Sequence, residues 1–271
     1  MSGGLLQRWP SLRDTGFLAR PRRYGQIMFA LLQREQERRR ASPLESIADV
    51  LEPLALVCVM AFMWSYLNKR TTSPLGDSSV LFIATGFYAK FYWISLAKLT
   101  KATIGTSKRR FPVERRFDYV LIHLLLTTGD YLVLALVGFG FLYWFYTPTA
   151  IPFNYVPIVE SMLAIVALGF GWGMITVVMT KFFWPWSYFA GLFNRALIFF
   201  SGIFFMVEFL PPGPREVMSY NPMTHAIALF RTGFYANYPT GVLDSTYLAY
   251  CAIVSVFIGI VLERITVRFE D

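Results

Sequence analysis

Residues 201–234 read SGIFFMVEFLPPGPREVMSYNPMTHAIALFRTGF, and this stretch decides how the C-terminal part of the chain is organised. It begins with an apolar run and reaches three closely spaced prolines, Pro211, Pro212 and Pro214. Because proline lacks a backbone N–H and fixes φ, these residues must end the helix that precedes them. Asn221-Pro222 then predicts a new helix, with the Asn221 side chain as its cap and proline at its first position.

The new helix is expected over 222–235, about 14 residues or about 21 Å long at 1.5 Å per residue. A bilayer core is about 30 Å thick, so this helix is too short to cross it. The helix is amphipathic, with Met223, Ala226, Ile227, Phe230 and Phe234 on one side and Thr224, His225, Arg231 and Thr232 mostly elsewhere. Half-length helices at membrane depth are tolerated where protein or a water-filled cavity satisfies their backbone. The pattern therefore predicts a broken, re-entrant helix, typical of transport proteins.

Composition supports a membrane location for the whole chain. The protein has 271 residues, of which 55% are hydrophobic and 15% are charged, whereas soluble domains have about 25% charged residues. The net charge of +8 does not indicate a nucleic-acid partner, because most Arg and Lys flank apolar spans. Cys58 and Cys251 both lie in apolar segments and predict neither a disulfide nor a metal site.

We predict an all-α, polytopic membrane protein with six transmembrane helices and an N-terminal amphipathic interface helix over 24–40. A cytoplasmic segment, 1–46, precedes the transmembrane domain, 47–271. In span four, small residues at Gly169, Gly171 and Gly173 suit close helix packing. The expected spans are 47–67, 80–99, 119–145, 158–180, 187–210 and 245–262.

The distribution of basic residues predicts the orientation. Arg and Lys gather in the N-terminal segment and in the 100–118 loop, and the opposite loops hold few. By the positive-inside rule, both termini and the 100–118 loop are cytoplasmic, and the broken helix is external.

The stretch 201–234 closely resembles the C-terminal signature of type-2 ABC exporter permeases, in the branch that exports capsular polysaccharide and O-antigen. The resemblance extends to SPLESIADVLEP at 42–53 and to Phe111-Pro112-Val113. It implies a permease subunit in the bacterial inner membrane that moves a lipid-linked, acidic, capsular polysaccharide out of the cytoplasm. It also implies a homodimer, two copies of a separate ATP-binding cassette ATPase, and a periplasmic or outer-membrane export partner. A pore at the dimer interface would then be lined by spans one, two and five.

The basic 100–118 loop has two interpretations. It is either a solvated cytoplasmic loop, or, as in the family, the coupling element that docks onto the ATPase. In the second case its charges steer docking and its apolar residues anchor it. The candidate coupling residues are Arg109, Arg110, Phe111, Pro112, Arg115 and Arg116.

Lys90 and Arg195 lie inside apolar spans, where a cation costs a few kcal/mol. We expect them either to contact an anionic substrate or lipid head group, or to pair within the membrane, with Asp130 as the candidate partner. The aromatic cluster of span two suits repeated weak stacking on sugar rings, although helix packing explains aromatic residues equally well. These candidate pathway residues are Tyr88, Phe91, Tyr92 and Trp93.

Three polar residues belong to the external broken helix. Asn221 is expected to be a cap. His225 and Arg231 are expected either to close an outer gate or meet a periplasmic partner, or to lie on the surface.

The sequence lacks the common motifs for phosphate binding, metal binding and nucleophilic catalysis. No Gly is followed by Lys, so there is no phosphate-binding P-loop. No Cys/His cluster has metal spacing and no nucleophile elbow is present. We predict a non-enzyme without a cofactor, whose ATP and magnesium are bound by the partner ATPase. The alternatives are export of O-antigen, teichoic acid or a lipophilic drug on the same fold, a polytopic glycosyl or acyl transferase, and an ion-coupled carrier.

Overall fold

The computed structural model describes residues 28–33, 36–37, 55, 59, 63, 75–76, 78–98 and 116–270. The chain divides into two units, Met1–Glu45 and Ser46–Asp271. In the first unit, residues 28–33 and 36–37 are helical, as expected for the helix over 24–40. In the second unit the regular elements of the described residues are all helices, which confirms the all-α class. Of the first expected span, only the helical Ala55, Val59 and Met63 lie within the described residues.

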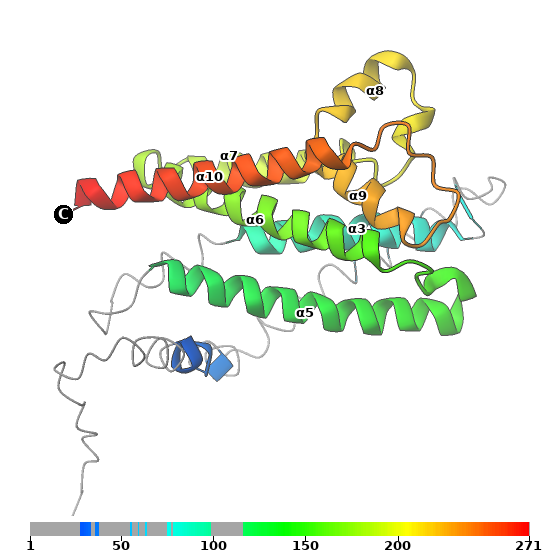
Figure 1. Ribbon diagram of the computed structural model, residues 1–271, viewed down its shortest axis with the longest axis horizontal. Helices are drawn as coiled ribbons and strands as arrows, with labels where there is room; N and C mark the ends of the chain where they lie inside the picture. The colour runs from blue at the N-terminus through cyan, green and yellow to red at the C-terminus, as the bar shows by residue number, and fades with distance from the viewer. Residues whose placement is uncertain are drawn as a thin grey trace, which may run out of the picture. The chain divides into compact units, whose positions relative to one another are not determined.

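Four long helices form the body of the second unit (Figure 1). They are α3 (Ser79–Ala97), α5 (Arg116–Phe145), α6 (Val156–Phe182) and α10 (Ser245–Glu270). Each contains a segment long and apolar enough to cross a membrane: Ser79–Ala97, Val120–Phe145, Val156–Phe182 and Ser245–Thr266. These segments correspond to the expected spans two, three, four and six.

Shorter elements lie between them in the chain: η1 (Pro148–Ala150), α7 (Trp186–Phe199), η2 (Val207–Phe209), α8 (Pro212–Ser219) and α9 (Pro222–Thr232). The expectation of one continuous helix over 187–210 is wrong, because α7 has 14 residues and ends at Phe199. At Gly202 φ is +69°, a left-handed conformation that glycine adopts without steric cost. The chain therefore turns well before the three prolines, and Pro212 starts the short helix α8 instead.

Helix α6 packs against α10, α3 and α9, and glycines set the close approach. A Cβ atom on Gly169 would stand 2.7 Å from Cβ of Leu96 in α3, and one on Gly171 would stand 2.7 Å from Cβ of Ser255 in α10. The predicted role of these small residues in helix packing is confirmed at both positions. Helices α8 and α9 sit at the end of the bundle opposite the C-terminal end of α10 (Figure 1).

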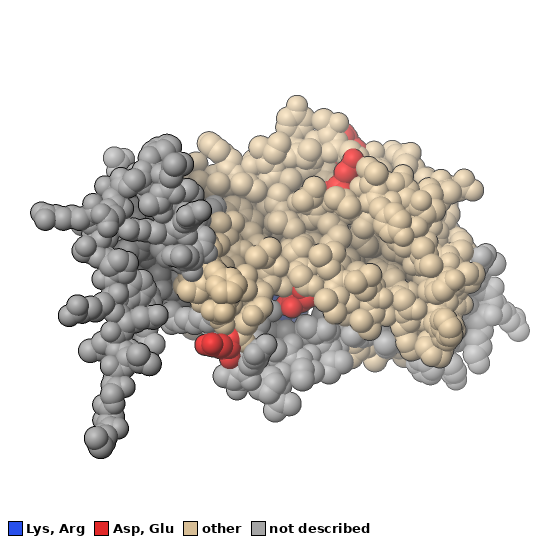
Figure 2. Space-filling view, turned by 60° about the horizontal axis from the view of Figure 1, so that its bottom comes forward, with Lys and Arg blue, Asp and Glu red and all other residues tan. Residues whose placement is uncertain are grey.

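The outer faces of α5 and α10 expose large apolar side chains. They include Leu125, Leu132, Val133, Leu136, Val137 and Phe141 of α5, and Tyr250, Ile253, Val254 and Phe257 of α10. On the face shown in Figure 2, the described residues carry few charged side chains. An apolar surface of this extent is suited to lipid, because a soluble monomer rarely exposes one.

Candidate functional site

Asn221 joins the start of α9 to the end of α7. Its Oδ1 accepts a hydrogen bond from the Met223 N–H at 3.0 Å, and this confirms the predicted cap. Its Nδ2 donates to the Phe200 carbonyl at 2.8 Å and to Ser201 Oγ at 3.1 Å. One side chain therefore satisfies a donor at the first turn of α9 and an acceptor just beyond the last residue of α7.

Arg231 lies near the other end of α9 and is 1% exposed, so the surface position considered for it is wrong. Its Nη1 donates to the Gly202 carbonyl at 2.7 Å, and its Nη2 donates to the carbonyls of Ile203 at 2.8 Å and Phe82 at 2.9 Å. The guanidinium carbon also lies 3.6 Å from the centre of the Phe82 ring. Arg231 thus fastens α9 to α3 and to the turn after α7.

Gly86 of α3 makes room for this arrangement. A Cβ atom there would stand 2.7 Å from Nη2 of Arg231 and 3.1 Å from Cα of Ile203. Because one neighbour is the backbone of the turn, the space cannot be recovered by rotating a side chain. The absence of a side chain at Gly86 lets the turn and the guanidinium lie directly against α3.

A cavity of about 10 Å³ lies beside Arg231, and Glu208, His225 and Tyr238 also line it. Its volume corresponds to about one water molecule. Oε2 of Glu208 is buried and has no hydrogen-bond partner among the described residues. Sequence reasoning missed Glu208; the available signal was a single acid within the apolar run before the prolines.

His225 is buried and ties the ends of three helices together. Its Nδ1 accepts a hydrogen bond from the Asp244 N–H at 3.0 Å, so the neutral ring carries its proton on Nε2 and donates to the Ser219 carbonyl at 2.7 Å. The ring also lies 5.1 Å from the ring of Tyr247 in α10. The surface position considered for His225 is therefore wrong, since it links α8, α9 and the start of α10 from inside.

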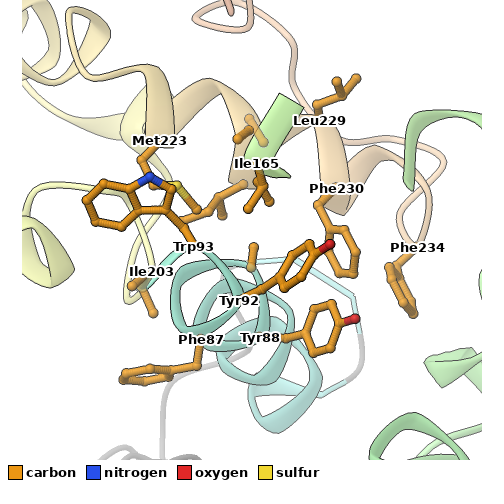
Figure 3. Close-up of a cluster of buried hydrophobic side chains, with 14 of the residues drawn as sticks. Phe87, Tyr88, Tyr92, Trp93, Ile165, Ile203, Met223, Leu229, Phe230 and Phe234 are labelled. Carbon is orange, nitrogen blue, oxygen red and sulfur yellow. The ribbon is translucent and has the colours of Figure 1, made fainter. Parts of the chain in front are cut away.

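Tyr88 and Tyr92, two predicted pathway residues, are packed between α3 and α5. The Tyr88 hydroxyl donates to the Tyr131 carbonyl at 2.9 Å, and the Tyr92 hydroxyl hydrogen-bonds Thr128 Oγ1 at 2.9 Å. Tyr88 also stacks on Phe230 of α9 at 5.3 Å between ring centres, and Figure 3 shows both tyrosines leaving α3 on the side of Phe230. In this structure the two rings belong to the core rather than to an open passage.

The other aromatic candidates of α3 point away from the tyrosines. Phe91 is half-buried and stacks on Phe87 at 5.6 Å between ring centres. Trp93 is buried, and Figure 3 shows its ring leaving α3 on the side away from Tyr88 and Tyr92. Its ring is 6.4 Å from that of Trp172 in α6.

Lys90 and Arg195, two basic residues within predicted spans, lie in very different environments. Lys90 is 0% exposed, its Nζ lies 4.1 Å from the centre of the Trp93 ring, and it has no hydrogen-bond partner among the described residues. Lys90 therefore does not pair with Asp130, and this alternative for Lys90 is wrong. Arg195 lies on the exposed part of α7. Of the candidate coupling residues, positions 109–112 and 115 lie outside the described residues, and Arg116 is the first residue of α5.

Long apolar helices pack around the short helix α9 and an irregular turn whose carbonyls are satisfied by side chains. This is the architecture of an integral-membrane transport protein. The family model for the ABC-2 type transporter matches residues 26–235, and the chain belongs to this family.

Several relatives resemble the chain over most of its length. The polysialic acid transport protein KpsM of Escherichia coli is 24% identical over 221 residues, which cover 79% of this chain and 83% of KpsM. The capsule polysaccharide export inner-membrane protein CtrC of Neisseria meningitidis serogroup B is 24% identical over 218 residues, 78% of this chain and 79% of CtrC. The capsule polysaccharide export inner-membrane protein BexB of Haemophilus influenzae is 23% identical over 224 residues, 79% of this chain and 80% of BexB.

Proposed function

We propose that this chain is the membrane-spanning permease subunit of an ATP-driven exporter that moves capsular polysaccharide across the bacterial inner membrane. The observation that carries the proposal is the family match over residues 26–235, together with relatives named for capsule export that align with most of the chain. The cargo is a lipid-linked, acidic polysaccharide. Cations within the apolar segments, Lys90 and Arg195, favour an acidic polymer over a lipophilic drug.

The proposed topology has six crossings with both termini in the cytoplasm. The four long helices supply crossings two, three, four and six, and residues 47–67 supply the first. Helix α7 and the turn after it form the fifth crossing, and α8 and α9 re-enter from the outer side. Asn221 and Arg231 support this arrangement, because they satisfy carbonyls of a non-helical turn that lipid would leave without partners.

The proposed assembly is a homodimer with two copies of a separate ATP-binding cassette ATPase, and a periplasmic or outer-membrane partner carries the polymer onward. The ATPases bind ATP and magnesium and act on the permease through the N-terminal helix and the 100–118 loop. Among the candidate pathway residues, Arg195 supports a polar conduit between subunits, because it is the single charged residue of α7 and is exposed. A cation facing hydrocarbon is costly, and such residues usually face a bundle interior or a cavity.

Deletion of the gene in its native strain tests the proposal. We expect polysaccharide to vanish from the surface of intact cells and to accumulate inside, so that antibody to the capsule stains only permeabilised cells. The wild-type gene on a plasmid should restore surface staining, and the empty plasmid should not. Normal surface capsule in the deletion strain, or a loss of polymer from both compartments, would contradict export. The second result would favour a role in synthesis, as for a membrane transferase.

A further inference from the structure

A groove lies between α8 and the segment that follows α9, and we call it the α8 groove. Its volume is about 410 Å³, which is within the size range of sites for small ligands. Helix α8 supplies Pro212, Arg215, Glu216 and Ser219 to its lining, and the segment after α9 supplies Gly241 and Val242. The groove is therefore formed by two segments that are separate in the sequence, and it is lined by charged, polar and apolar groups together.

Arg215 is the hydrogen-bond donor of the groove. Its side chain is half-buried, and its guanidinium forms no hydrogen bond or ion pair with the described residues. A Cβ atom on Gly241 would stand 3.4 Å from Nη2 of Arg215, so the guanidinium reaches from α8 to the backbone of the facing segment. The missing side chain at Gly241 leaves this planar, forked group open to a ligand, and its geometry matches a carboxylate.

Glu216 and Ser219 supply acceptors. The Ser219 hydroxyl donates to the Glu216 carbonyl at 2.7 Å, so toward a ligand its oxygen can only accept. An ionised Glu216 carboxylate also only accepts. Because Ser219 follows Arg215 by four positions on α8, the two side chains share one face of the helix. The groove therefore complements a ligand that offers one carboxylate and several hydroxyl donors.

This chemistry favours an acidic sugar over a free anion or a protein partner. The carboxylate of Glu216 disfavours an ion with two charges, such as free phosphate, because like charges repel. A stable protein interface needs about 1,000 Å² or more and has an apolar centre, whereas a few residues of two short segments form this groove. A sugar acid has one charge, hydroxyl donors, and C–H faces that can pack on Pro212 and Val242.

We propose that the α8 groove binds one acidic sugar unit of the exported polymer on the outer side of the membrane. Arg215 pairs with the carboxylate of the sugar, and Glu216 and Ser219 accept hydrogen bonds from its hydroxyl groups. Helix α8 lies at the end of the bundle opposite the C-terminal end of α10 (Figure 1), and this end is external in the proposed topology. This inference deepens the proposed function, on which the outer location and the source of the sugar rest.

A binding measurement tests the groove. The full chain, purified with its ATPase in detergent, is titrated against a fluorescently labelled acidic oligosaccharide cut from the capsule of the native strain, and binding is followed by fluorescence anisotropy. The comparison probe is the same oligosaccharide with its carboxyl groups reduced to alcohols. We expect saturable binding of the acidic form and binding about tenfold weaker for the reduced form, since a hydrogen bond to a charged group contributes about that factor.

Two variants assign this binding to the groove. Arg215→Gln removes the charge and should weaken binding of the acidic oligosaccharide about tenfold. Its matched control, Arg264→Gln, removes the same charge from an exposed position near the C-terminal end of α10 and should bind as wild type. Gly241→Leu keeps every charge but fills the groove beside Arg215, so it should weaken binding as well. Its control is Gly138→Leu on α5, where nothing lies within 4 Å of the new Cβ atom.

The possible outcomes separate this inference from the proposed function. Equal binding by wild type, Arg215→Gln and Gly241→Leu, or equal binding of the reduced oligosaccharide, overturns the inference. Variants that lose a co-purifying envelope protein but bind the oligosaccharide as wild type does also overturn it, in favour of a protein-docking surface. Normal capsule export by a wild-type protein that binds no acidic oligosaccharide overturns the groove and leaves the proposed function standing. Groove-dependent binding by a chain whose deletion leaves surface capsule unchanged supports the groove and overturns the proposed function.

Discussion

Arg231 connects segments that are far apart in the sequence, since its guanidinium reaches carbonyls of Phe82 in α3 and of Gly202 and Ile203 in the turn after α7. A turn of this kind leaves carbonyls without the partners that a helix provides. In a membrane, such groups must be satisfied by protein. Arg231 meets this requirement with a rigid, forked group that donates in several directions, which a lysine cannot reproduce.

Replacement of Arg231 by lysine should therefore destabilise the fold although the charge is kept. The ammonium cannot reach all three carbonyls. The Phe82 carbonyl would still accept from the Thr85 hydroxyl, but a buried turn carbonyl left unsatisfied costs about 1–3 kcal/mol. We expect a clear drop in the apparent melting temperature of the purified protein in detergent. The matched change Arg215→Lys, on the more exposed helix α8, should shift it little. Equal shifts for the two variants would show that the network around Arg231 does not hold the turn.

At the scale of helices, the sequence predicted those elements whose signals are local. Asn221-Pro222 correctly marked the start of α9, and Gly169 and Gly171 correctly marked close packing. The end of α7 was mispredicted because 187–210 is mostly apolar and carries no local signal for a break. The turn depends instead on Gly202 and on side chains that follow it by some 20 to 30 positions.

The partners of single side chains were equally beyond prediction. Tyr88 and Tyr92 have the same sequence pattern whether they face a conduit or hydrogen-bond to α5, as they do here. Burial of Arg231 and His225 was not foreseen either, because an amphipathic helix places polar residues on its outer side by default. Their partners come from α3, α8 and the residues before α10, whose proximity no local pattern encodes.

The contact between α3 and the turn after α7 offers a test at this scale. Gly86→Ala would place a methyl group 2.7 Å from Nη2 of Arg231 and 3.1 Å from Cα of Ile203, so the turn must move away from α3. We expect a loss of about 1–3 kcal/mol, as for other overpacked sites, measured as a lower melting temperature and reduced surface capsule. Gly138→Ala on α5, where nothing lies within 4 Å of the new methyl group, is the control and should behave as wild type. An undisturbed Gly86→Ala protein would show that this close approach is unnecessary.

For the whole molecule, the proposed topology predicts which loop meets the ATPase. Arg109→Glu combined with Arg110→Glu reverses two charges in the 100–118 loop and should reduce the amount of ATPase that co-purifies with the permease. Lys69→Glu combined with Arg70→Glu reverses the same number of charges in the loop assigned to the outside. That control should leave co-purification unchanged. A stronger loss in the control pair would reverse the proposed orientation.

The central claim is that this chain, together with an ATPase, moves capsular polysaccharide through the membrane. The most direct measurement reconstitutes the permease and its ATPase in vesicles with the ATPase facing outward, supplies lipid-linked polysaccharide and ATP, and then adds a polysaccharide-degrading enzyme. We predict that polymer becomes protected inside the vesicles only when ATP and both proteins are present. Polymer that stays fully degradable with the complete system, or that is protected equally without this chain, would contradict the claim.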